Sequence, residues 1–444
     1  MTTPLRNSQD ESLVKQTFLT AGLQEPPGTT RADFISHPME SAMTALLWHI
    51  RLAQQVGYHL EVGAALTYPE AYVPAESMLD PVAPHVPMTT RRDGTGIDLS
   101  TGDAKTIIDA CGQKVHICDV AFFDNPLHHD DVIRNQVHEH MLRCARAAVM
   151  LRPVGCTGVA GFVGRNYFLT PQQNLAWFEK HFIPILQKFK KMGVVFYGEN
   201  CPMPGLTTGE MFIHNMCHSA YMFLRLYWLC KKHGVEDVFR ITYDVSHDIL
   251  QGTSHYATFA VMKAAGLGHV LARFHGKNQY RDPVETALHG VRGPIIDLGC
   301  EIDGQPHPDP RERLGAWQKM GGCRHGMKGI GHYNPVAMND NMEDDWFDQH
   351  HAMRSVLGLD PLTVYDIAEH EFNAARTQDA KMIERMLRIS MAYSRHIDAA
   401  ADAQYRSTLW SKEDGIELLG TPNPKYTLPG LQERVDALKR KYAA

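Results

Sequence analysis

The sequence predicts an α/β protein in which eight parallel strands close into a barrel with helices around it. Three observations lead to this fold class. Short β-branched or aromatic runs alternate with longer segments of helical period, which is the order expected of a mostly parallel sheet. The short runs are apolar throughout, as strands buried on both faces are. The chain has 444 residues, enough for one large barrel with additions.

Eight runs qualify as strands, and helical segments separate the later ones. The predicted strands are residues 13–20, 59–66, 115–123, 156–162, 194–198, 239–243, 269–274 and 364–368. The predicted helices include residues 131–150, 172–192, 214–232 and 256–265. The first two carry apolar residues on one face, and Gly193 suits a helix stop. Eight strand–helix units predict a (β/α)8 TIM barrel.

The predicted barrel covers residues 13–371 and has two additions. Residues 276–363 form a long insertion before the last strand, rich in Gly, Pro, His and Asp. Loops of this length are usually functional or disordered. Residues 372–444 form a charged, helical C-terminal extension. Either a dimer contact or a helix packed across the barrel would explain it, and from it we expect a homo-oligomer.

The composition argues against several classes of function. A net charge of −6 offers no electrostatic attraction to nucleic acid or to an anionic membrane, so we expect neither as a partner. The nine cysteines include no C-x-x-C pair, which argues against a secreted disulfide scaffold. No apolar signal core or membrane-spanning run is visible, so a cytoplasmic protein is expected. No glycine-rich phosphate-binding fingerprint indicates a nucleotide cofactor.

A carboxylate or an imidazole ends each of the last four predicted strands: Glu199, Asp244, His275 and Glu369. In a barrel these ends converge at one mouth, where active sites lie. Each residue alone has an ordinary explanation, as a helix cap or a core histidine, but four in register favour a joint role. Three carboxylates that meet repel one another and raise their pKa values, a cost that a divalent cation removes.

The ligand types indicate which metal is expected. Mostly oxygen ligands with one imidazole favour Mn²⁺ or Mg²⁺, and they also permit Co²⁺, Fe²⁺ or Zn²⁺. Glu371 shares a strand face with Glu369 and is an alternative to it, although the strand end favours Glu369.

Segments across roughly residues 110–371 resemble, in order, the motifs of the xylose-isomerase-like TIM-barrel family of sugar phosphate isomerases and epimerases. They are NPLHHD (125–130), GFVGRN (161–166), GENCPM (198–203), YDVSHDILQG (243–252), FHGKN (274–278) and IAEHE (367–371). The resemblance implies that the four strand-end residues are metal ligands and that His247 and Lys277 line the substrate site. Two features depart from the family: the motif often written H-A-K-D is H-G-K-N here, and the long insertion follows it.

The resemblance implies a divalent-metal-dependent sugar isomerase or epimerase with a small-molecule sugar as substrate. Glu199 and Glu369 would be the acid/base pair that moves a proton next to the sugar carbonyl, through a metal-stabilised enediolate. His247 would orient a hydroxyl. Lys277 would bind a hydroxyl or an anionic group, and a solvated rim residue is an equal explanation for it.

Three other functions remain open at this stage. The same proton abstraction on a 3-keto-glycoside would expel the aglycone, which makes a C- or O-glycoside lyase the main alternative. A related barrel, that of the AP endonucleases, hydrolyses DNA with three zinc ions and a basic surface, and the negative net charge counts against it. A non-catalytic sugar-binding barrel would not need metal-ligand types at four strand ends.

Overall fold

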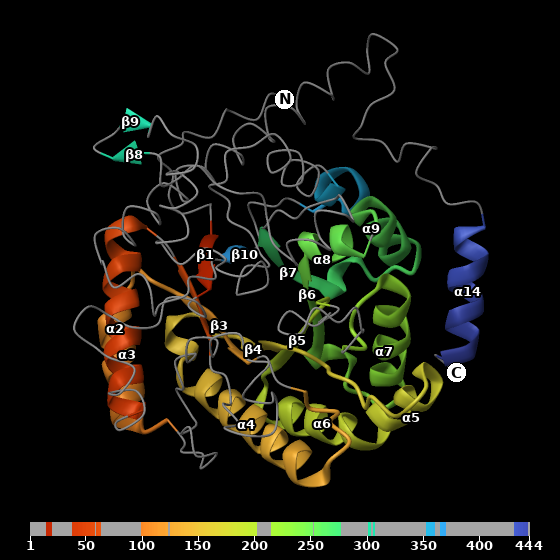
Figure 1. Ribbon diagram of the computed structural model, residues 1–444, viewed down its shortest axis with the longest axis horizontal. Helices are drawn as coiled ribbons and strands as arrows, with labels where there is room; N and C mark the ends of the chain where they lie inside the picture. The colour runs from red at the N-terminus through yellow and green to blue at the C-terminus, as the bar shows by residue number, and fades with distance from the viewer. Residues whose placement is uncertain are drawn as a thin grey trace.

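The computed structural model describes a closed ring of eight strands (Figure 1). Neighbours around the ring follow the order β1-β10-β7-β6-β5-β4-β3-β2, and every pairing in it is parallel. The strands are β1 (Lys15–Leu19), β2 (His59–Gly63), β3 (Ile117–Phe122), β4 (Gly158–Gly161), β5 (Val195–Glu199), β6 (Phe239–Asp244), β7 (Leu271–Gly276) and β10 (Tyr365–Glu369). Each predicted strand overlaps one of these eight.

The structure describes residues 15–19, 38–57, 59–63, 99–122, 125–201, 215–251, 253–276, 301–302, 305–306, 352–359, 365–369 and 430–442. Most of the predicted insertion and C-terminal extension lies outside these ranges, so the domain boundaries stay predictions. The short antiparallel pair β8 (Glu301–Ile302) and β9 (Gln305–Pro306) and a π-helix (Met353–Leu357) fall within the insertion. No described helix is long and apolar enough to cross a membrane.

Helices surround the ring on its outer side (Figure 1). They are α2 (Pro38–Val56), α3 (Thr101–Cys111), α4 (Asp131–Met150), α5 (Pro171–His181), α6 (Ile183–Met192), α7 (Ala220–Lys232), α8 (Val245–Leu250) and α9 (His255–Ala264). Single 3-10 turns at Arg152–Val154, Glu236–Val238 and Gly268–Val270 lead into β4, β6 and β7. After β7 the described residues include the π-helix Met353–Leu357, which contacts α9, and after β10 they include α14 (Leu431–Tyr442).

The main apolar core lies between the strands and these helices. Phe182 at the start of α6 packs on Phe178 of α5 and on Phe196 of β5, each with ring centroids 5.1 Å apart. All three side chains are fully buried. The apolar faces predicted for residues 131–150 and 172–192 therefore face the barrel. This outer core carries the hydrophobic burial, which leaves the barrel interior available for polar side chains.

Local sequence signals set most helix ends. The Asp130 side chain accepts hydrogen bonds from the backbone of Val132 and Ile133, so α4 begins at the predicted residue. The prediction of one helix over residues 172–192 is wrong, because the chain breaks at Phe182 into α5 and α6. Pro184 follows the break and has no N–H to donate to the preceding turn. Gly193, with φ of 64°, ends α6 as predicted.

The segment before α7 and the segment after β6 differ from prediction. The predicted helix 214–232 begins only at Ala220, since Asn215 makes hydrogen bonds to the carbonyls of Glu199 and Cys201 instead of helical ones. The short helix α8, which was not predicted, begins directly after the last residue of β6. Both features lie at the carboxyl ends of β5 and β6, where the site is built.

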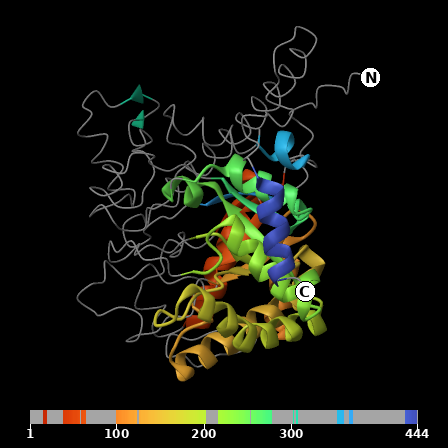
Figure 2. The same ribbon diagram turned by 90° about the vertical axis from the view of Figure 1, so that its right-hand side faces the viewer.

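Helix α14 (Leu431–Tyr442), the described part of the C-terminal extension, packs against α7 and α9 of the same chain (Figure 2). Val435 is 1% exposed, and Tyr442 stacks under the Arg225 guanidinium at 5.4 Å. The sequence left two explanations for the extension, a dimer contact and a helix packed across the barrel. Its described part is a helix that packs on the outer helices of the same chain.

Gly158 is expected to tolerate no side chain, because β4 and β5 approach closely there. An added Cβ would overlap the carbonyl oxygen of Val195 and lie 2.6 Å from the Tyr197 ring. We expect Gly158→Ala to lower the free energy of unfolding by about 1–3 kcal/mol, measured by guanidinium denaturation. Gly102→Ala in α3 is the control, since its Cβ would meet only Ser100 Oγ at 3.7 Å. Equal midpoints for the two variants would contradict this packing.

Candidate metal centre

Three of the four predicted metal ligands lie together at the barrel mouth. Glu199, Asp244 and His275 lie at the carboxyl ends of β5, β6 and β7, which are neighbours in the ring. One donor atom from each lies within 4.8 Å of the other two. His275 Nδ1 is 3.9 Å from Glu199 Oε1 and 4.0 Å from Asp244 Oδ2. Ligands about 2.1 Å from a common ion lie about 3–4 Å apart, so these atoms are spaced for one cation.

The side chain of Asn200 couples the ends of β5 and β6. Its Nδ2 donates to the Asp244 carbonyl at 2.9 Å, and its Oδ1 accepts from the Asp244 backbone N–H at 2.6 Å. Successive residues of a strand point to opposite faces. Asn200 therefore points toward the end of β6, whereas Glu199, the residue before it, points into the barrel mouth.

Asn215 fixes the chain that leaves β5. Its amide donates to the carbonyls of Glu199 (2.8 Å) and Cys201 (2.9 Å), and its carbonyl accepts from the backbone of Gly164 (3.1 Å). Asn215 is fully buried. The backbone around Glu199 is thus held from both sides, so the carboxylate position is set by the fold and not by loop motion.

A second polar layer is built around Arg273 and Tyr197, which lie two residues before His275 and Glu199 on β7 and β5. Arg273 donates from Nε to Asp119 Oδ2 (2.8 Å) and from Nη2 to Thr157 Oγ1 (2.8 Å) and Tyr197 Oη (3.2 Å). Its guanidinium also lies 4.4 Å from the centre of the Tyr197 ring. The buried charge of Arg273 is therefore paired and hydrogen-bonded, and this layer forms a rigid floor under the candidate metal centre.

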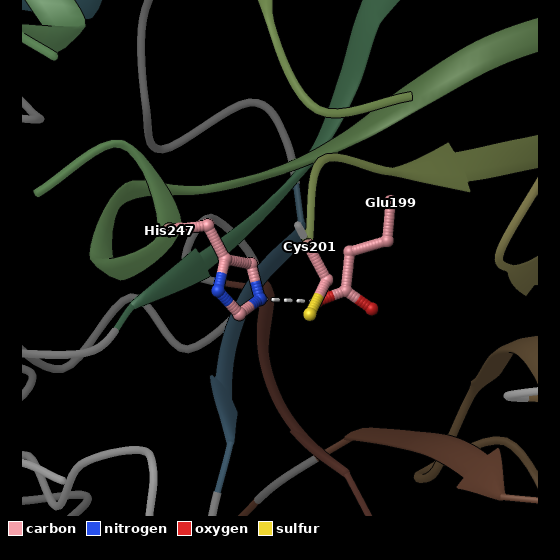
Figure 3. Close-up of side chains that lie close together, drawn as sticks. All are labelled: Glu199, Cys201 and His247. Atoms are coloured by element: carbon pink, nitrogen blue, oxygen red, sulfur yellow. Dashed lines mark hydrogen bonds and ion pairs between the residues drawn. The ribbon is translucent and has the colours of Figure 1, made fainter. Parts of the chain in front are cut away.

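His247, predicted to line the substrate site, lies among the ligands themselves. It comes from α8, is 1% exposed, and its Nε2 is 2.9 Å from Glu199 Oε1 and 3.2 Å from Asp244 Oδ2 (Figure 3). Burial, the largest single influence, disfavours its charged form, but the Asp244 carboxylate together with Cys201 and Glu199 outweighs it, and the pKa of His247 is raised well above its ordinary value. In this arrangement the imidazole holds a proton between two carboxylates.

Glu61 is a site residue that the sequence analysis missed. It projects from β2, is fully buried, and its Oε2 lies 3.1 Å from His275 Nε2, the ring nitrogen that faces away from the other ligands. Burial and, next, the charge of Asp119 raise the pKa of Glu61 to about 7, although His275 lowers it. In the sequence Glu61 is the only acidic residue of the apolar run HLEVGAAL. It was missed because it lies inside this run, whereas the predicted ligands were selected at strand ends.

Cys201 is the second missed residue. It follows Glu199 by two positions, is 1% exposed, and forms a compact group with Glu199 and His247 in which one donor atom from each lies within 4.8 Å of the others (Figure 3). The sequence signal was the cysteine in GENCPM, which shares the strand parity of Glu199.

Of the remaining predicted residues, the structure describes only the backbone of Glu369, and it does not describe Lys277 or Glu371. Glu369 ends β10, which lies next to β7 in the ring, one residue beyond the pair Ala368–Gly276. Its strand end therefore reaches the same rim as His275. Lys277 lies outside the described residues, immediately after β7, and Glu371 also lies outside them.

The residues present fit a divalent cation. Two buried carboxylates and an imidazole converge, with the His247 side chain between the carboxylates, and the pKa of a third carboxyl, that of Glu61, is raised. The second oxygen of Glu61, Oε1, is buried without a hydrogen-bond partner among the described residues. Buried carboxylates at this density need a compensating positive charge, and Glu199, Asp244 and His275 would hold it.

No protein-family model matches the sequence, and no curated protein matches it significantly. Among solved structures, similarity is found to a D-psicose 3-epimerase from Clostridium cellulolyticum H10 with D-tagatose (10% identity, TM-score 0.46, 86% of this chain and 99% of that chain). It is also found to a xylose isomerase domain protein from Alicyclobacillus acidocaldarius (10%, 0.44, 80% and 94%) and to an IolI protein with a bound zinc atom (10%, 0.47, 87% and 99%). Likeness at this level assigns no activity, and the barrel of this chain is shown by its own strand pairing.

Glu61 is expected to hold the His275 ring in the orientation that turns Nδ1 toward Glu199 and Asp244. Glu61→Gln keeps the size of the side chain but weakens the acceptor for His275 Nε2. We expect the Kd for Mn²⁺, measured by titration calorimetry, to rise by about 10- to 100-fold, as it does when the partner of a metal-ligating histidine is lost.

Glu179→Gln is the matched control for this experiment. It makes the same substitution beside a histidine on the outer helix α5, where Glu179 Oε1 accepts from Lys232 Nζ (2.9 Å) and lies 2.6 Å from His233 Nε2. A Kd that rises equally in both variants, or in neither, would show that Glu61 does not orient the ligand.

Proposed function

We propose that this chain is a divalent-metal-dependent enzyme that isomerises or epimerises a small sugar by moving a proton next to a carbonyl. One observation carries the proposal: Glu199, Asp244 and His275, from three neighbouring strands, converge in a buried cluster with donor atoms within 4.8 Å of one another. We propose Mn²⁺ or Mg²⁺ as the resident ion, with Co²⁺, Fe²⁺ and Zn²⁺ as alternatives. A bound ion supplies the positive charge that lowers the energy of an enediolate.

Glu199 is the proposed base, because its carboxylate is buried at the mouth and close to a proton carrier. Its Oε1 lies 2.9 Å from Nε2 of His247. The Nε2–H of His247 donates to this carboxylate and holds it in place for proton abstraction, and the imidazole can also present a hydrogen-bond donor to a substrate hydroxyl. The rigid backbone on both sides of Glu199 favours a fixed attack geometry, which is worth several orders of magnitude in rate.

Glu369 is the proposed partner acid/base and fourth ligand, because its strand reaches the same rim on the far side of His275. A second carboxylate on the opposite side of the substrate would return the proton to the other face or to the neighbouring carbon. Lys277, which follows β7 directly, is proposed to bind a hydroxyl or an anionic group of the sugar.

The test of the reaction is proton exchange in D₂O. Metal-loaded wild-type protein is incubated with a panel of ketopentoses, ketohexoses and their phosphates, and deuterium at the carbon beside the carbonyl is followed by NMR together with the epimer or aldose formed. We expect exchange and isomer formation in the wild type, loss of both with a chelator, and recovery with Mn²⁺ or Mg²⁺. Glu199→Gln should lower kcat by about 10²- to 10⁴-fold, because the base is lost.

Glu179→Gln is the control, since Glu179 lies on the outer helix α5 in an ion pair with Lys232, and its activity should equal that of the wild type. Two outcomes would contradict the proposal. Absence of exchange across the panel with stoichiometric metal would remove the isomerase assignment. Release of an aglycone from 3-keto-glycosides without any epimer would replace it with the lyase alternative.

A further inference from the structure

The barrel mouth contains two groups of donor atoms that share Glu199. The group with Asp244 and His275 is the candidate metal centre described above. The other consists of Glu199, Cys201 and His247, and its donor atoms also lie within 4.8 Å of one another (Figure 3). All three residues are at least 97% buried, with exposures of 3%, 1% and 1%.

The position of Cys201 is built into the backbone. It follows Glu199 by two residues, just beyond the end of β5, and both side chains lie against His247 (Figure 3). Asn215, itself fully buried, holds both carbonyls, those of Glu199 and Cys201, through one amide group. The thiol and the carboxylate therefore face His247 together because one side chain fixes the two-residue step between them.

The contacts of Cys201 resemble those of a metal-ligating cysteine more than those of a cysteine packed in an apolar core. Cys201 is hydrogen-bonded to His247, whose Nε2 lies 2.9 Å from Glu199 Oε1. A buried thiol with an ordinary packing role looks different: Cys217 nearby donates only to the Gly198 carbonyl at 3.6 Å and belongs to the large apolar cluster. Cys201 is absent from both apolar clusters of described residues.

We propose that Glu199, Cys201 and His247 form a second metal-binding position, which takes a borderline cation such as Zn²⁺ or Co²⁺. A thiolate, an imidazole and a carboxylate suit these ions, whereas the harder group with Asp244 suits Mn²⁺ or Mg²⁺. Binding replaces two protons: the thiol of Cys201 loses one, and Nε2 of His247 gives up the one it shares with Glu199. The inference rests on the proposed function only through Glu199, which both positions use.

Thiolate ligation has a spectroscopic signature that tests this inference directly. Metal-free full-length protein is titrated with Co²⁺, and the near-ultraviolet charge-transfer band of a cobalt–thiolate bond is recorded. We expect the band in the wild type and its loss in Cys201→Ser. X-ray absorption of the Zn²⁺-loaded wild type should show a sulfur ligand at about 2.3 Å. No band at saturating Co²⁺ and no sulfur scatterer would overturn the inference.

The variant is compared with a matched one at the neighbouring buried cysteine. Cys217→Ser should keep the band, because that thiol lies outside the donor group. Far-UV circular dichroism and the unfolding midpoint check that both variants fold. A band that persists in Cys201→Ser would assign the thiolate elsewhere and would also overturn the inference.

Metal selectivity gives a second readout that does not depend on cobalt. Cys201→Ser should weaken Zn²⁺ binding by more than about 10-fold and change Mn²⁺ binding by less than about 3-fold, since only the softer ion gains from a thiolate. Equal losses for both ions would make Cys201 a structural residue and contradict the second position.

Asp244→Asn separates this inference from the proposed function. It removes a ligand of the first position only, so proton exchange on sugars and tight Mn²⁺ binding should be lost while the cobalt–thiolate band remains. A cobalt–thiolate band without proton exchange on sugars in the wild type would support the second metal position and contradict the proposed function. Proton exchange without the band would support the proposed function and contradict the second metal position.

Discussion

Two hydrogen bonds between Asn200 and the backbone of Asp244 set the geometry on which the rest of the site depends. They join the ends of β5 and β6 at the point where regular sheet pairing stops. Because the side chains of a strand alternate in direction, fixing Asn200 on one face fixes Glu199 on the other. The same coupling places the Asp244 carboxylate opposite Glu199, within reach of the next strand end at His275.

The barrel can accommodate so many buried charges because its apolar core lies elsewhere. The phenylalanines that carry the burial are outside the ring, between strands and helices, where hydrophobic area contributes most of the folding free energy. Inside, Arg273 neutralises Asp119 and is fully hydrogen-bonded to its neighbours. One layer higher the carboxylates of Glu199 and Asp244 lie against His247 and His275, and this is where the divalent cation is proposed to bind.

The parts of this arrangement that follow from periodicity could be predicted from the sequence. Apolar runs that end at Glu199, Asp244 and His275 predicted both the strands and three side chains that converge, because a strand end is a local feature. Glu61 could not be found this way, since its partner His275 is 214 positions away and only the closed ring brings the two together. The break at Phe182 was missed because the apolar stripe continues through it, while the missing N–H of Pro184 decides the backbone.

The path of the chain beyond β5 explains how one carboxylate can belong to two donor groups. Asn215 holds the carbonyls of Glu199 and Cys201, while Asn200 between them ties the end of β5 to β6. On one side of Glu199 the neighbouring strands offer Asp244 and His275, a hard set of ligands. On the other side the chain's own continuation offers a thiol next to His247. In the two proposed metal positions the flanking donors, and not Glu199, would therefore decide which cation binds, since the shared carboxylate suits either kind of ion.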